Sequence, residues 1–172
     1  TATEKDIQDY KEEFDSAEDR EIQSWKENCV YEVVDAETMA EQNFTLLNTR
    51  WVYTWKDVEG KRKAKARLVV KGFEDPMKNS VPTDSPTVEK SILNMMLQII
   101  LQNNWIPVVL DVKTAFLQSN ELTRDVYVKP PKRYRKKGEI WKIKKPVYGL
   151  SDASRKWYET LIGALQRYGM KL

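Results

Sequence analysis

The chain has 172 residues, of which 41% are apolar, so it is long enough to bury a hydrophobic core in one domain or slightly more. It contains no histidine and a single cysteine, Cys29. This composition excludes histidine-based acid/base chemistry, serine and cysteine triads, CxxC redox chemistry and zinc sites made of cysteine and histidine. Any catalysis must therefore use carboxylates, lysine, arginine, tyrosine or hydroxyl groups.

The net charge of +3 conceals an uneven distribution of charge along the chain. Residues 1–48 hold 14 acidic and 4 basic residues, a net charge of −10, whereas residues 49–172 hold 12 acidic and 25 basic residues, a net charge of +13. A basic body favours a polyanionic partner, nucleic acid ahead of a membrane, over a merely solvated basic surface. No apolar run approaches the roughly 20 residues of a membrane span, and the acidic N-terminus does not resemble a signal peptide. An intracellular protein is expected.

Residues 4–28 have apolar side chains at roughly helical intervals and contain neither glycine nor proline, which predicts one or two amphipathic helices. The apolar positions are Ile7, Tyr10, Phe14, Ala17, Ile22 and Trp25. Aromatic residues are uncommon in disordered tails, so this acidic leader is expected to pack against the basic body or a partner. A short strand is predicted at 30–34, followed by a turn and loop at 35–43.

From Trp51 the pattern changes to strict alternation, which predicts a β-hairpin with a turn at 57–60 and a second strand at 61–71. One face of the second strand carries only cations, namely Lys61, Lys63, Lys65 and Arg67, and the opposite face carries Ala64, Ala66, Leu68 and Val70. At about 3.3 Å per residue, Lys63 to Arg67 spans roughly 13 Å, the length of a nucleoside triphosphate tail. A solvent-facing strand would normally carry acidic residues among the basic ones, but no acidic residue lies between Gly60 and Glu74.

A helix is predicted to begin at 85–87 and to bury the stripe Val88, Ile92, Met95, Met96, Ile99 and Ile100. Residues 106–110 are apolar and predict a buried strand, followed directly by Asp111. Because an unpaired carboxylate is rarely buried, Asp111 is either a turn or cap residue or part of a site where a cation neutralises it.

Five sequence blocks, in order, resemble the reverse transcriptase of copia-type LTR retrotransposons. They are Arg50–Tyr53, Lys65–Phe73, Leu110–Leu117, Val126–Val128 followed by Pro130 and Pro131, and Val147–Leu150 followed by Arg155–Tyr158. The resemblance implies an α+β fold with reverse-transcriptase-like fingers and a partial palm. The implied division is an acidic helical leader at 1–44, fingers at 45–88 and 118–147, and a partial palm at 89–117 and 148–172.

The resemblance also implies roles for individual residues. Asp111 would be the first catalytic aspartate and a ligand of two Mg²⁺ ions, which would be bound only in a complete enzyme. The implied nucleotide-binding residues are Lys65, Arg67, Val112, Lys113, Thr114, Phe116, Tyr148 and Gly149. Phe116 would exclude a ribose 2′-hydroxyl, and the backbone of 112–114 would face the triphosphate.

The expected nucleic-acid-binding residues are cations of the hairpin and of a later basic run. They are Lys61, Lys63, Lys71, Lys132, Arg133, Arg135, Lys136 and Lys137. The run at 132–137 is either a solvated loop or part of the interface. A polymerase of this kind would act on an RNA or DNA primer–template and deoxynucleotides, in a cytoplasmic virus-like particle or in the nucleus.

Two departures from the family pattern affect the expected function. Ser151–Ser154 replace the usual Lys-Gln-Ala-Pro stretch, and the Asp-Asp pair of the second catalytic motif occurs nowhere in these 172 residues. The sequence therefore predicts the N-terminal part of an RNA-directed DNA polymerase, a nucleotidyltransferase of a Pol polyprotein, that is inactive as this isolated chain. The alternative is a domesticated, non-catalytic descendant that binds RNA or a protein partner within a larger assembly.

Overall fold

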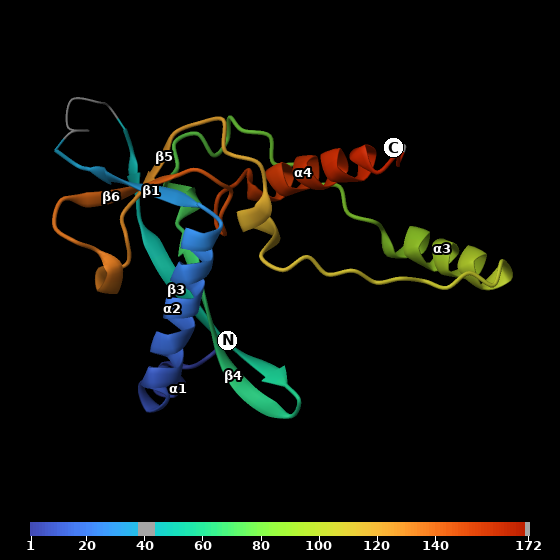
Figure 1. The fold of residues 1–172 in the computed structure, drawn as a ribbon, viewed down its shortest axis with the longest axis horizontal. Helices are drawn as coiled ribbons and strands as arrows, with labels where there is room; N and C mark the ends of the chain where they lie inside the picture. The colour runs from blue at the N-terminus through green and yellow to red at the C-terminus, as the bar shows by residue number, and fades with distance from the viewer. Residues whose placement is uncertain (38–43, 171–172) are drawn as a thin grey trace.

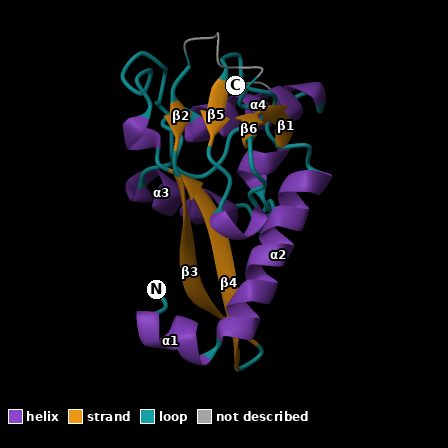
Figure 2. Ribbon diagram, turned by 90° about the vertical axis from the view of Figure 1, so that its left-hand side faces the viewer, coloured by secondary structure: helices purple, strands orange, loops and turns teal. Residues whose placement is uncertain are grey.

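The computed structural model describes residues 1–37 and 44–170, so most of the loop expected at 35–43 lies outside the described residues. It contains a four-stranded sheet and a separate two-stranded hairpin, with a long helix lying along the hairpin (Figures 1 and 2). The mixed α and β content agrees with the expected fold class. No helix of the described residues is long and apolar enough to cross a membrane.

The leader forms two helices, as its periodicity predicted. Helix α1 spans Glu4–Asp9 and α2 spans Lys11–Glu27. The Thr3 hydroxyl accepts a hydrogen bond from the Asp6 amide while the Asp6 carboxylate accepts one from the Thr3 amide, a reciprocal N-terminal cap. Helix α2 buries Phe14, Ala17, Ile22 and Trp25. The leader is therefore docked on the body of the chain.

The hairpin consists of β3, Thr49–Val58, and β4, Lys61–Val70, in antiparallel register with Trp51 opposite Leu68. The turn is shorter than predicted, because β3 continues to Val58 and β4 begins at Lys61, which leaves only Glu59 and Gly60, both with positive φ, between the strands. A two-residue turn with positive φ at both positions has a backbone twist that matches the right-handed twist of the flanking strands. Helix α2 packs along β4, and the Ala2 amide donates to the Tyr53 carbonyl of β3 at 3.0 Å. The leader therefore covers both edges of the hairpin.

The four-stranded sheet has the order β1-β6-β5-β2. Its strands are β1 at Tyr31–Asp35, β2 at Leu46–Leu47, β5 at Val126–Val128 and β6 at Glu139–Ile143. Strand β1 confirms the strand expected at 30–34. The main core joins this sheet to the leader and hairpin through Trp25, Leu68, Val128 and Trp141. The stacked rings of Tyr31 and Trp141, with centroids 4.0 Å apart, close this core at one side.

Short 3-10 helices and a C-terminal helix complete the body. They are η1 at Gly72–Glu74, η2 at Ala115–Gln118, η3 at Lys132–Tyr134 and α4 at Ala153–Arg167. Asp152 is the N-cap residue of α4, but its side chain makes no capping hydrogen bond. The carboxylate instead binds Arg124.

The segment 86–113, called the arm here, projects away from the body (Figure 1). Its helix α3 begins at Lys90, later than expected, ends at Gln102, and has no buried residue. The strand predicted at 106–110 is wrong, because these residues have no regular structure and are exposed. An apolar stripe is buried only when another element covers it, and within the described residues no strand pairs with 106–110. The expected core contacts of Val88, Ile92, Met95, Met96 and Ile99 are therefore absent from the described structure.

Candidate functional site

The cationic face of β4 has the alternation that the sequence predicted. Ala64, Ala66, Leu68 and Val70 are buried on one face, while Lys61, Lys63, Lys65 and Arg67 occupy the other. Lys65 and Arg67 are half-buried. Burial, together with the nearby charges of Arg67 and Lys56, lowers the pKa of Lys65, and the carboxylates of Glu21 and Asp111 oppose this shift. Asp111 and Glu21 thus both contribute negative charge to the electrostatic environment of Lys65.

Three predicted nucleotide-binding residues from distant parts of the sequence lie together at the end of β4. The Arg67 Cζ atom lies 5.5 Å from the centroid of the Tyr148 ring. The Phe116 ring meets Tyr148 edge-on, with centroids 5.1 Å apart. The Val70 amide donates to the Tyr148 carbonyl at 2.8 Å, which fixes the Tyr148 backbone to the strand. Arg67, Phe116 and Tyr148 thus form one contiguous surface.

Gly149 permits this arrangement through its backbone conformation and its lack of a side chain. Its φ is +97°, and a Cβ atom at this position would lie 1.9 Å from the Val70 carbonyl oxygen. Gly72 faces it, and a Cβ there would lie 1.9 Å from the Gly149 carbonyl oxygen. The Tyr148–Gly149 motif therefore packs directly against the end of β4, and the two glycines make the close approach possible.

Lys65 and Thr114 line one hollow of about 360 Å³ beside β4, hereafter the β4 hollow. Thr114 has a left-handed backbone with φ of 49° and precedes η2. The adjoining Asp111, Val112 and Lys113 are exposed and lie on the arm, although the Lys113 carbonyl accepts a hydrogen bond from Gln118 at 2.7 Å. The predicted nucleotide-binding set is thus divided between a packed part on the body and an exposed part on the arm.

The described residues supply only part of the divalent metal site that the resemblance implies. Two metal ions need several oxygen ligands, and Asp111 is the one carboxylate that the resemblance supplies. Within residues 1–37 and 44–170, no group of three histidine, cysteine, aspartate or glutamate residues could hold a metal ion. The described residues therefore do not fit a two-metal centre, and no catalytic step can be derived from them alone.

The basic run at 132–137 is divided between two environments. Arg133 binds helix α2 through Asp19 at 2.8 Å, Glu18 at 3.5 Å and the Asp15 carbonyl at 2.9 Å. The Tyr134 hydroxyl donates to Asp19 at 2.8 Å, and this bond, with the Arg133 charge, lowers the pKa of that carboxyl. The remaining cations line two hollows that both include Lys129 and Arg135; Lys132 borders one, and Lys136 and Lys137 border the other.

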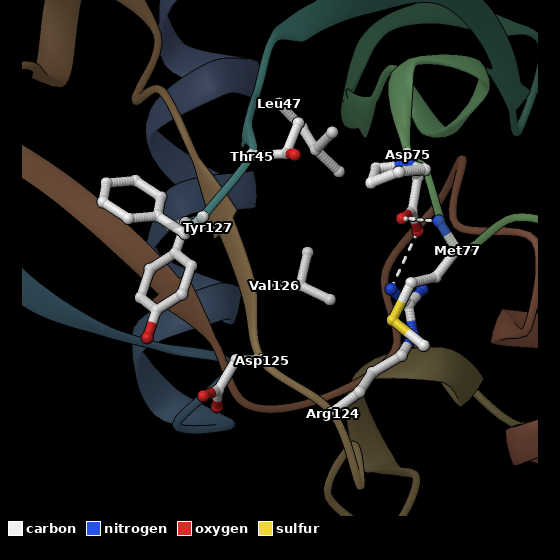
Figure 3. A pocket seen from close by; sticks show the side chains of 10 residues that line it. Thr45, Leu47, Asp75, Met77, Arg124, Asp125, Val126 and Tyr127 are labelled. Atoms are coloured by element: carbon white, nitrogen blue, oxygen red, sulfur yellow. Dashed lines mark hydrogen bonds and ion pairs between the residues drawn. The ribbon is translucent and has the colours of Figure 1, made fainter. Parts of the chain in front are cut away.

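A buried ion cluster that the sequence did not reveal holds three segments of the body together. Arg124 contacts Asp75 at 2.8 Å and Asp152 at 3.0 Å, and all three side chains are largely buried. Figure 3 shows the Arg124–Asp75 contact beside a hollow that Met77, Val126 and Tyr127 also line. Asp152 lies in the stretch that departs from the family pattern, and its charge is balanced by Arg124. The cluster fixes the start of α4 and therefore the Tyr148–Gly149 loop just before it.

Comparison with known proteins assigns the chain to a family. Residues 28–172 match the model of the reverse transcriptase (RNA-dependent DNA polymerase) family. The chain belongs to the reverse transcriptase family. It is similar to Pol polyproteins of copia-type transposons, and the earlier resemblance is confirmed. No solved structure matches it.

Three relatives show how this reverse transcriptase segment compares with complete polyproteins. It is 34% identical over 131 residues to the retrovirus-related Pol polyprotein from transposon RE1 of Arabidopsis thaliana, which covers 73% of the chain and 9% of that protein. It is 32% identical over 157 residues to the corresponding polyprotein from transposon TNT 1-94 of Nicotiana tabacum, covering 86% of the chain and 11% of that protein. The Ty1-DR4 Gag-Pol polyprotein of Saccharomyces cerevisiae is 31% identical over 109 residues, or 62% of the chain and 7% of that protein. The chain thus spans about a tenth of the plant relatives' length.

Proposed function

We propose that these residues form the fingers and the first part of the palm of an RNA-directed DNA polymerase. In this proposal β3 and β4 form part of the fingers, and the body binds the phosphates of an incoming deoxynucleotide through Lys65 and Arg67. Arginine offers a forked pair of donors to phosphate and lysine a point charge. The observation that carries the proposal is the convergence of Arg67, Phe116 and Tyr148 at the end of β4.

Phe116 and Tyr148 are proposed to support the sugar and base of the nucleotide. Their edge-on contact gives a rigid aromatic surface beside the Arg67 guanidinium. A ring held below the sugar would reject a 2′-hydroxyl by steric exclusion. The backbone of 112–114 would then face the triphosphate when the arm is packed.

Catalysis is proposed to require carboxylates beyond the single Asp111. In a complete polymerase, divalent ions, most simply Mg²⁺, would stabilise the attacking and leaving oxygens during nucleotidyl transfer. One exposed aspartate cannot hold two ions in register. The 172-residue chain by itself is therefore expected to be inactive.

Primer extension tests this function. The assay uses an RNA template with an annealed DNA primer, deoxynucleotides and Mg²⁺, with either this chain or a longer polypeptide that adds an Asp-Asp hairpin after it. The longer polypeptide should extend the primer, its Asp111→Asn variant should not, and the 172-residue chain should give only background. A longer polypeptide that binds RNA but never extends the primer would contradict the proposal and favour a non-catalytic nucleic-acid-binding descendant.

Binding of the primer–template is proposed to be mainly electrostatic. The predicted cations that remain available are Lys61, Lys63, Lys71, Lys132, Arg135, Lys136 and Lys137. Lys129 joins this set because it lines the same two hollows, and Arg133 leaves it because its charge is paired with α2. The affinity of the chain for single-stranded RNA should fall with salt, with a log–log slope of about −0.7 for each phosphate neutralised. An affinity independent of salt would contradict this part of the proposal.

A further inference from the structure

We propose that helix α2 forms one wall of the triphosphate-binding site and that its Arg20 is a phosphate-binding residue. This inference rests on the proposed function, because it takes Lys65 and Thr114 as contacts of the nucleotide triphosphate. It adds a residue of the acidic leader to a site that the sequence motifs place only in the hairpin and in the segment after Asp111.

The β4 hollow brings these segments together. It is lined by Arg20 and Glu21 of α2, by Lys56, Lys63 and Lys65 of the hairpin, and by Thr114 before η2. It thus contains four cations and one carboxylate within about 360 Å³. Such a surplus of positive charge in a concave surface suits a polyanion. Figure 2 shows α2 running beside β4 along this edge.

Side chains of α2 bind the backbone of β4 and so hold the helix in place as a wall. The Glu21 carboxylate accepts a hydrogen bond from the Leu68 amide at 3.3 Å, and Arg20 donates to the Ala64 carbonyl at 3.3 Å. Ala17, Ala64 and Ala66 are buried where the helix meets the strand, so small side chains permit this close packing. The wall is therefore part of the folded body.

The protein positions the Arg20 guanidinium with hydrogen bonds that occupy only some of its N–H donors. It donates to the Ser16 hydroxyl at 2.8 Å and to the Ala64 carbonyl at 3.3 Å. A guanidinium has five N–H donors, so these two bonds leave donors for a ligand while fixing the plane of the group. The side chain is exposed to solvent and borders the same hollow as Lys63 and Lys65. A fixed fork beside two lysines is suited to bidentate binding of a phosphate.

Glu21 lies on the same wall of the hollow as Arg20 but carries the opposite charge. Its carboxylate contributes negative charge to the hollow, while its oxygen accepts from the Leu68 amide and from Trp25 Nε1 at 3.3 Å. Glutamine at position 21 would keep an acceptor for these donors and remove the charge. If the hollow binds a polyanion, Glu21→Gln should strengthen binding and Arg20→Gln should weaken it.

The test is calorimetric titration of the 172-residue chain with inorganic tripolyphosphate at low ionic strength. Arg20→Gln and Lys65→Gln should each weaken binding about tenfold, the effect of losing a charge-assisted hydrogen bond. Glu21→Gln should tighten binding severalfold, and Arg20→Lys, which keeps the charge but loses the fork, should fall between wild type and Arg20→Gln. Lys26→Gln is the matched control, because Lys26 is an exposed cation of α2 that does not border the hollow.

The outcomes separate this inference from the proposed function. If Lys65→Gln weakens binding while Arg20→Gln and Glu21→Gln match Lys26→Gln, α2 is not part of the site and the inference is wrong, but the polymerase proposal stands. Equal weakening by all the cation variants, Lys26→Gln included, would indicate non-specific charge attraction and also overturn it. Absence of tripolyphosphate binding by the wild-type chain would overturn it too, whereas the polymerase proposal depends on primer extension by the longer polypeptide. Thermal unfolding of each variant shows whether it is folded, and Arg20→Lys replaces Arg20→Gln if the latter is not.

Discussion

The body and the arm carry similar apolar patterns but differ in what covers them. Trp25 and Leu68 in the body have no exposed surface, whereas Ile106 and Val109 in the arm are 89% and 93% exposed. In the body α2 packs against β4, and the four-stranded sheet packs against the leader. Periodicity therefore specifies which face of an element can be buried, but its burial depends on a partner surface.

The same division separates the two halves of the candidate site. The residues of the body proposed to bind phosphate, sugar and base are held by β4, Gly149 and the Arg124 cluster, so their geometry is built into the packed core. Asp111, Val112 and Lys113 lie on the arm and have no comparable support. The proposed nucleotide-binding part is therefore preorganised, whereas the proposed catalytic residue Asp111 would require the arm to be packed.

The largest expected difference comes from truncating an apolar residue in each region. Trp25→Ala should lower the free energy of unfolding by about 4 kcal/mol, because it removes a fully buried indole that packs on Tyr31 and Trp141. Leu101→Ala, at a position that is 75% exposed on the arm, should change it by less than about 0.5 kcal/mol. Urea denaturation measures both, and comparable losses would contradict the division into body and arm.

Gly149→Ala should also destabilise the body by about 3 kcal/mol. The cost combines a left-handed backbone with a Cβ that would meet the Val70 carbonyl oxygen. Gly60→Ala is the control, because Gly60 has φ of +75° but a Cβ there would have no neighbour within 4 Å. Gly60→Ala should lower the free energy of unfolding by only about 1 kcal/mol, the cost of backbone strain. Equal losses in urea denaturation would mean that the close approach of Gly149 to β4 is unimportant.

A smaller loss is expected from the ion cluster, whose buried charges are left unpaired when Arg124 is removed. Arg124→Met should cost about 2 to 3 kcal/mol, because Asp75 and Asp152 remain buried. Lys142→Met, which breaks an ion pair with the exposed Asp125, should cost less than about 1 kcal/mol. If adding Asp75→Asn and Asp152→Asn to Arg124→Met recovers none of the loss, charge is not its cause.

Glu21→Gln should have the smallest effect on stability, and its effect should depend on pH. Burial raises the pKa of Glu21 above its ordinary value, despite hydrogen bonds from Leu68 and Trp25 and the nearby cations. A raised pKa in the folded state means that folding favours the protonated form, so this contribution is present at low pH and is lost as pH rises through the folded pKa. The variant should therefore have a higher thermal midpoint than wild type at pH 7 and a similar one below about pH 4. A difference independent of pH would show that ionisation of Glu21 is not responsible.

The elements predicted correctly from sequence are those specified by local patterns. Alternation from Trp51 onward and the pair Glu59–Gly60 define the hairpin, and the helical spacing of Phe14, Ile22 and Trp25 defines the buried face of α2. The predicted strand at 106–110 was wrong because a strand also needs a pairing partner, which local sequence does not reveal.

The parts of the site that sequence could not give depend on contacts between distant residues. Arg133 belongs to a basic run, yet its charge is paired with that of Asp19, which lies 114 positions away in the sequence. Arg124 and Asp152 are 28 positions apart, and neither has a local signal that marks it as buried. Arg20 and Glu21 belong to an acidic segment that the motifs leave out, and only their position beside β4 brings them to the candidate site.

Hydrogen–deuterium exchange of the 172-residue chain, resolved by peptide, tests the central claim most directly. Amides of α2, β3 and β4 should exchange slowly and together, because they belong to one packed unit. Amides of 106–112, which form no regular structure, should exchange within the first labelling time. Protection of 106–112 equal to that of β4 would contradict the account, since Asp111 would then already be held in a packed element of this chain.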